Sequence, residues 1–124
     1  MAEQTLLTRD FTLETLVALR HDVERCAVRE GLIDLALYRF VVAVNELTTN
    51  AVRHGGGQGR LVLWRTGDQL HCRVTDHGPG LPVSSQPAMP SADAIGGRGL
   101  LLASHGVERL TVDGTSVTAS TRLR

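Results

Sequence analysis

Two polar residues with metal-binding and proton-accepting chemistry, Glu46 and Asn50, lie four residues apart in a segment of periodic apolar residues. At that spacing both side chains project from the same side of a helix, and His54 continues the ridge one turn later. A carboxylate and an amide oxygen suit Mg²⁺, which takes a few protein oxygens and keeps waters or phosphates. Taken alone, however, the pair is better explained as a solvated polar helix face.

A second candidate is Asp76, which follows an expected strand and precedes Gly78-Pro79-Gly80. A carboxylate at a strand end can accept a hydrogen bond from an exocyclic amino group of a base. The glycines beside it let a flat ring approach the backbone. The alternative is a plain turn, because Asp, Gly and Pro are all turn formers, and alone this alternative is the simpler one.

A third candidate is the run Gly96-Gly97-Arg98-Gly99, which precedes a short apolar helix expected at residues 100–104. Free backbone N–H groups at a helix start bind anions, and glycines let phosphate oxygens come close. The Arg98 guanidinium can add a charge-assisted contact to a phosphate. A flexible linker remains the alternative interpretation of this run.

The composition excludes several classes of protein. All thirteen basic residues are arginine, so a phosphate-binding loop ending in Gly-Lys, a kinase strand lysine and Schiff-base chemistry are excluded. The formal charge is zero and no basic stripe is visible, which argues against direct nucleic-acid binding. With no long apolar run and no signal peptide, we expect a cytoplasmic protein without a membrane contact. Cys26 and Cys72 form no metal-binding pair and are expected to be buried free thiols.

These residues must be positioned by elements whose order the pattern predicts. We expect a strand over residues 5–11, a helix from Thr12 to near Gly31, and a second helix from a cap at Asp34 to the glycines 55–57. Alternating residues then predict two hairpins, turned at residues 67–68 and 113–114. Between the hairpins, residues 78–99 have loop composition and suit a lid. Early helices and late hairpins indicate an α+β two-layer sandwich in one domain spanning residues 1–124.

The three candidates in this order resemble the N box and the two glycine boxes of the Bergerat-fold ATPases, which include gyrase and the sensor histidine kinases. The matching segments are residues 45–55 (Asn-Glu-Leu-Thr-Thr-Asn-Ala-Val-Arg-His-Gly), 75–82 (Thr-Asp-His-Gly-Pro-Gly-Leu-Pro) and 96–100 (Gly-Gly-Arg-Gly-Leu). The resemblance implies a mixed, mostly antiparallel sheet covered on one face by about three helices, and binding of ATP with Mg²⁺. Within the superfamily, the short form with Ala-Val-Arg-His-Gly is similar to the anti-sigma-factor serine kinases.

The resemblance also implies residue roles. Asn50 is expected to be the Mg²⁺ ligand, Glu46 the general base for the attacking hydroxyl, and Asp76 the adenine contact, assisted through water by Thr115. The remaining nucleotide contacts are expected from both glycine boxes and the end of the N box, at Arg53, His54, Gly78, Gly80, Gly97, Arg98, Gly99 and Leu100.

Three functions follow from this resemblance. The first is an anti-sigma factor that sequesters an RNA polymerase sigma factor and phosphorylates a serine of an anti-sigma-factor antagonist. The second is a non-catalytic ATP-binding switch module. The third is the catalytic domain of a histidine kinase, which needs an upstream phosphoacceptor hairpin; His21-Asp22 lacks the following proline and the second helix. Relatives that dimerise suggest a homodimer formed through the N-terminal strand and helix.

Overall fold

The computed structural model describes residues 3–76 and 109–123. The expected lid at residues 78–99 and the expected helix at residues 100–104 lie outside this part of the chain. The described elements are β1 (Glu3–Thr12), a 3-10 turn (Leu13–Thr15), α1 (Leu16–Arg29), α2 (Asp34–His54), β2 (Gln58–Thr66), β3 (Gln69–Asp76), β4 (Arg109–Asp113) and β5 (Ser116–Arg122).

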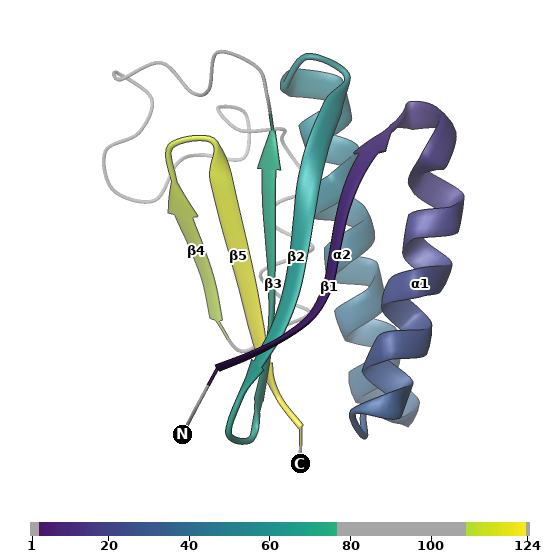
Figure 1. Cartoon of the computed structure of the whole chain (residues 1–124), viewed down its shortest axis with the longest axis vertical. Helices are drawn as coiled ribbons and strands as arrows, with labels where there is room; N and C mark the ends of the chain where they lie inside the picture. Colours follow the sequence, from purple (N-terminus) through teal and green to yellow (C-terminus); the bar gives the residue numbers. More distant parts are fainter. Residues whose placement is uncertain (1–2, 77–108, 124) are drawn as a thin grey trace.

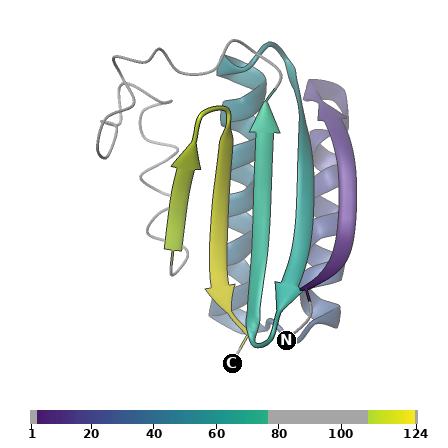
Figure 2. The same cartoon turned by 60° about the vertical axis from the view of Figure 1, so that its left-hand side comes forward.

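The fold is a two-layer α+β sandwich, as the order of the elements predicts. Five strands form one sheet in the order β1-β2-β3-β5-β4, and every described pairing is antiparallel. Both α-helices pack on the same face of this sheet, whereas the other face carries no described element (Figures 1 and 2). At one end of the sheet, the start of β3 lies beside the end of β5. At the other end of the sheet, the end of β3 lies beside the end of α2.

The two helices form because their apolar residues recur on one face and meet the sheet. Buried side chains of α1 and α2 contact a layer contributed by β1, β2, β3 and β5, and this core contains Phe11, Leu19, Val23, Cys26, Ala27, Leu32, Phe40, Ala43, Val44, Leu47, Ala51, Leu61, Leu63, Leu70, Cys72, Val74, Ala119 and Leu123. Both cysteines are free and buried, as predicted. Neither described helix is long and apolar enough to cross a membrane.

The helix starts differ in detail from the prediction. After Thr12 the chain first makes the 3-10 turn, in which the Thr12 N–H donates to Thr15 Oγ1 at 2.9 Å. The expected cap at Asp34 is wrong by one residue. Ile33 is the N-cap, because its carbonyl accepts a hydrogen bond from the Leu37 N–H at 3.2 Å. Asp34 is the first residue of α2 and has a φ of 54°. Aspartate tolerates this left-handed backbone better than most residues.

The open face of the sheet is polar and bears a side-chain network on β2, β3 and β5. The His71 ring bonds Thr66 Oγ1 through Nε2 and Ser120 Oγ through Nδ1, each at 2.7 Å. Trp64 stacks on His71 with ring centroids 5.0 Å apart, and the Arg73 guanidinium lies 4.9 Å from the Trp64 ring centroid. Flanked in this way, Trp64 is only 9% exposed although no described helix covers it.

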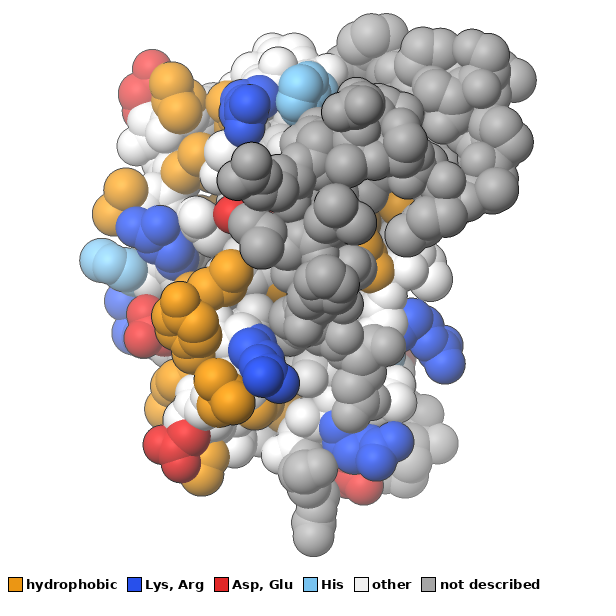
Figure 3. Space-filling model, turned by 180° about the vertical axis from the view of Figure 1, so that it is seen from behind, with side chains coloured by type: hydrophobic (Ala, Val, Ile, Leu, Met, Phe, Trp, Pro, Cys, Tyr) orange, Lys and Arg blue, Asp and Glu red, His pale blue; other side chains and the backbone are white. Residues whose placement is uncertain are grey.

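The outer surface of the helical layer is more apolar than the open sheet face. Figure 3 looks onto this layer, and hydrophobic side chains gather over it. The large hydrophobic side chains that are most exposed among the described residues all belong to the 3-10 turn, α1, α2 or their connection: Leu13, Val17, Val28, Ile33, Leu35 and Tyr38. Exposed apolar groups in such numbers are a common feature of protein-binding surfaces.

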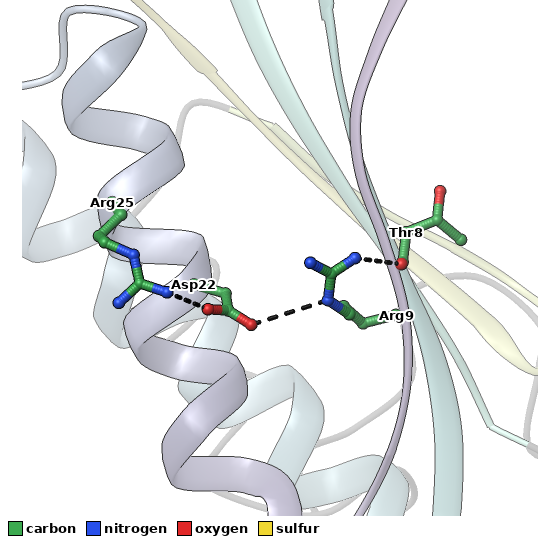
Figure 4. Close-up of polar contacts among 4 residues, drawn as sticks. All are labelled: Thr8, Arg9, Asp22 and Arg25. Atoms are coloured by element: carbon green, nitrogen blue, oxygen red, sulfur yellow. Dashed lines mark hydrogen bonds and ion pairs between the residues drawn. The ribbon is translucent and has the colours of Figure 1, made fainter.

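The edge strand β1 is fastened to α1 by a charged cluster (Figure 4). Asp22 of α1 accepts a hydrogen bond from Arg25 and lies 3.7 Å from Arg9 Nε on β1. A second nitrogen of the same guanidinium, NH1 of Arg9, donates to the Thr8 carbonyl at 2.9 Å. One carboxylate thus links the strand to the helix across the outside of the sandwich.

Candidate functional site

The predicted ridge of polar residues lies along α2, beside its buried stripe. Glu46 and Asn50 are half-buried, and Arg53 and His54 are exposed in the last turn. Within residues 3–76 and 109–123, the Glu46 and Asn50 side chains make no hydrogen bond or ion pair. A half-buried carboxylate and amide without such partners are available to a metal ion or to a hydroxyl group.

The ridge is held in place by contacts on both of its sides. Leu47 is 2% exposed in the core, and the buried Thr48 hydroxyl donates to the Val44 carbonyl at 3.0 Å. On the α1 side, Arg20 NH1 donates to Asn45 Oδ1 at 3.1 Å. The residues on either side of Glu46 are therefore fixed, which limits how far its backbone can move. Sequence reasoning missed the Arg20–Asn45 contact because the two residues are 25 positions apart.

Asp76 is the last residue of β3 and is half-buried. Its backbone N–H donates to the Thr115 carbonyl at 3.0 Å, just before β5 begins. On the other side it pairs with Gly59 of β2. The strand β2 and the turn before β5 thus fix the Asp76 backbone. The structure brings Thr115 next to Asp76 through its main chain. The predicted role of Thr115, which is to assist Asp76 through water, stays a prediction.

Asp76 also meets the C-terminal end of α2. A Cβ atom placed on Gly55, the C-cap of this helix, would lie 2.2 Å from Asp76 Cβ and 2.4 Å from Asp76 Cγ. The Asp76 side chain therefore lies directly against the Gly55 backbone, five residues beyond Asn50. The fold thus brings Asp76, which is distant in sequence, to the end of the helix that carries Glu46 and Asn50.

The local electrostatics suit a hydrogen-bond donor at Asp76. The C-terminal end of a helix carries partial negative charge on its free carbonyls, and a carboxylate beside it adds to the negative potential. Arg53 and His54 in the last turn of α2 offset part of this charge. An amino group with N–H donors is favoured at such a place, whereas a ligand carbonyl oxygen facing Asp76 is disfavoured.

Several predicted contacts cannot be placed. Both glycine boxes lie outside the described residues, apart from Thr75 and Asp76 at the start of the first one. The predictions that fall there are Gly78, Gly80, Gly97, Arg98, Gly99 and Leu100.

The His21-Asp22 pair, considered above as a phosphoacceptor-like motif, has a structural use. Asp22 is held between Arg9 and Arg25, so its carboxylate links β1 to α1 (Figure 4). His21 is exposed on α1. This contact accounts for Asp22 without any phosphotransfer role.

Comparison with known proteins identifies the family. No curated protein matches the chain. The family model for the histidine kinase-like ATPase domain matches residues 10–123, which is most of the chain and includes every element from the end of β1 onward. The match contains both the α2 ridge and Asp76. The chain therefore belongs to the histidine kinase-like ATPase domain family, and this membership implies an ATP-binding role.

Proposed function

We propose that this protein is an ATP-dependent partner switch: an anti-sigma factor that binds a sigma factor and phosphorylates a serine of an anti-sigma-factor antagonist. The observation that carries the proposal is the position of Asp76 against Gly55, at the end of the helix that bears Glu46 and Asn50. One short region then holds an acceptor for the adenine amino group, an amide for a cation and a carboxylate for a proton.

The residues present fit ATP with Mg²⁺ by their donor types. Asn50 offers an amide oxygen to a cation that also takes phosphate oxygens, which is the ligand set that Mg²⁺ prefers. Asp76 accepts a hydrogen bond from the exocyclic amino group of adenine. Guanine presents a carbonyl oxygen at the equivalent ring position and is disfavoured there. Bound Mg-ATP supplies the γ-phosphoryl group for transfer.

Glu46 is assigned the proton-accepting role. Its carboxylate is half-buried on the same side of α2 as Asn50, one turn earlier, so it lies near any phosphate held through Asn50. It would accept the proton of the antagonist's serine hydroxyl as that oxygen takes the γ-phosphoryl group, with ADP as the leaving group. General-base assistance of this kind is worth about 10²–10⁴-fold in rate.

Two further features support a role in partner binding. The exposed apolar side chains lie on the helical layer, where a protein can cover them. Leu13 and Val17, at the start of that layer, are 66% and 57% exposed and adjoin β1, so they also support a homodimer through the N-terminal strand and helix. Light scattering that gives a monomer at every concentration would remove the homodimer from this proposal.

The test is incubation of the protein with γ-labelled ATP and candidate antagonist proteins from the same genome. We expect label on a serine of one antagonist, and we expect Glu46→Gln to abolish transfer while ATP binding persists. If Glu46→Gln leaves both ATP binding and the response to the antagonist unchanged, the protein is a non-catalytic ATP-binding switch instead. Asn50→Ala is the matched variant, expected to lose Mg²⁺-dependent nucleotide binding itself.

A further inference from the structure

The glycines that follow α2 are present for two different reasons. Gly56 and Gly57 both have a φ of 90°, a left-handed backbone that favours glycine. Gly55 has a φ of −117° and a ψ of 28°, which any residue can adopt. Conformation therefore explains Gly56 and Gly57 but not Gly55. The requirement at Gly55 must come from the space around it.

The space around Gly55 is taken by Asp76. An added Cβ would lie 2.2 Å from Asp76 Cβ, 2.4 Å from Asp76 Cγ and 2.6 Å from the Ala51 carbonyl oxygen. Ordinary van der Waals contact is 3.4–4 Å, so even one methyl group forces atoms apart. The Ala51 carbonyl already accepts a hydrogen bond from the Gly55 N–H at 2.8 Å, and both belong to the end of α2.

The Asp76 backbone has little freedom to move away. Its N–H is bonded to the Thr115 carbonyl at 3.0 Å, and its position in the ladder opposite Gly59 joins it to β2. The helix is also anchored, because Ala51 and Leu47 are buried in the core. Rotation of the Asp76 side chain cannot relieve the contact at its Cβ, because that atom is fixed by the backbone. An added methyl group at Gly55 must therefore push the end of β3 and the end of α2 apart, and the Asp76 carboxylate is displaced with its backbone.

We propose that Gly55 is a positioning residue that determines base specificity: the absence of a side chain there holds the Asp76 carboxylate in the direction that accepts the adenine amino group. This inference rests on the proposed function of Asp76. It adds a residue that makes no polar contact to a nucleotide and acts only through Asp76.

The test compares dissociation constants for ATP and GTP, measured by calorimetry with Mg²⁺ present. For Gly55→Ala we expect ATP binding to weaken by about tenfold or more, the value of a hydrogen bond to a charged acceptor, with GTP binding unchanged. The ratio of the GTP dissociation constant to the ATP dissociation constant thus falls by about the same factor. Gly67→Ala is the matched control: Gly67 has a φ of 58° with nothing within 4 Å of an added Cβ, in the hairpin at the other end of the sheet. It is expected to lower stability and leave the ratio unchanged.

A second variant keeps the inference testable if Gly55→Ala folds poorly. Asp76→Gly removes the two nearest atoms that the new methyl group would meet and leaves, of the three nearest, only the Ala51 carbonyl oxygen. In that background Gly55→Ala is expected to lower stability less than it does alone, and to change the nucleotide ratio no further. Equal loss of stability in both backgrounds would show that Asp76 is not what the glycine accommodates.

The failures of the two proposals are distinguishable. If the unmodified protein binds neither nucleotide, or if Asp76→Ala, which removes the acceptor, leaves the ratio unchanged, the proposed function of Asp76 is wrong. If Asp76→Ala abolishes the preference for ATP but Gly55→Ala preserves it in a folded protein, only the positioning role of Gly55 is overturned.

Discussion

Replacing Gly59 with alanine is expected to lower the free energy of unfolding by about 1–2 kcal/mol. A Cβ atom there would lie 2.7 Å from Phe11 Cζ and 2.8 Å from the Thr75 carbonyl oxygen. Overpacking of this kind costs about 1–3 kcal/mol, whereas the reduced freedom of the unfolded chain offsets about 0.4–1 kcal/mol. The clash is difficult to relieve, because Phe11 is 2% exposed and Thr75 lies within the β2–β3 ladder.

The assay is a double-mutant cycle with Phe11→Leu, measured by urea unfolding. Phe11→Leu alone is expected to lower the free energy of unfolding by about 1 kcal/mol, because the smaller side chain leaves a partly filled cavity. In the Gly59→Ala protein, Phe11→Leu removes one of the two clashes. The free energy of unfolding of the double variant should therefore be about 1 kcal/mol higher than the sum of the two single effects predicts.

The control for this cycle is Gly57→Ala combined with Phe11→Leu. Gly57 has a φ of 90° and nothing within 4 Å of an added Cβ, so its substitution is strained without touching the ring. These two changes are expected to add. If the Gly59 and Phe11 effects also add to within about 0.5 kcal/mol, the packing argument is refuted and Gly59 is required for another reason.

Three further predictions concern the core, an ion pair and pH. Leu47→Ala should cost about 2–5 kcal/mol in unfolding free energy, because Leu47 is 2% exposed, whereas Val17→Ala, at a residue 57% exposed, should change it by less than about 0.5 kcal/mol. Arg65 NH1 lies 2.9 Å from Glu30 Oε1, so a cycle of Arg65→Met and Glu30→Gln should give a coupling of about 1 kcal/mol or less that shrinks with added salt. Burial lowers the pKa of His71, with a smaller opposing effect from Glu3 and a further lowering by Arg109. The unfolded chain therefore binds the proton first, and stability should fall as pH drops below about 6.5; His71→Gln should flatten this decline in urea unfolding measured between about pH 7 and pH 5.5.

The sequence predicts the elements well wherever the signal is local. The apolar spacing from Leu37 to Ala51 marks one helix face, and α2 is indeed buried along it. The turn at residues 67–68 is confirmed, since β2 and β3 flank it. The second turn lies one residue later than predicted, at residues 114–115, because Asp113 still pairs with Ser116. The errors are local too, and they concern the 3-10 turn before α1 and the cap at Ile33. Both depend on individual hydrogen bonds, and composition alone does not show at which of two neighbouring residues a helix starts.

The candidate site is predictable only in part, for the same physical reason. Glu46 and Asn50 share a helix face because of spacing alone, so the sequence suffices for them. The position of Asp76 against Gly55 depends on the register that pairs Gly59 with Asp76 and on how α2 packs across the sheet. No local pattern contains that information, and the contact is found only once the chain is folded.

The glycines at the end of α2 and the start of β2 show most clearly what a sequence omits. Gly56 and Gly57 stand where the backbone is left-handed, and Gly55 and Gly59 stand where a neighbour occupies the place of a side chain. All four are the same letter, yet alanine would strain the backbone at the first pair and displace Asp76 or Phe11 at the second. Only the second pair meets Asp76, the residue proposed to select the base, since Gly55 contacts the Asp76 side chain and Gly59 opposes its backbone. Substitution at Gly56 or Gly57 is therefore expected to change stability alone, whereas substitution at Gly55 should change which base is bound.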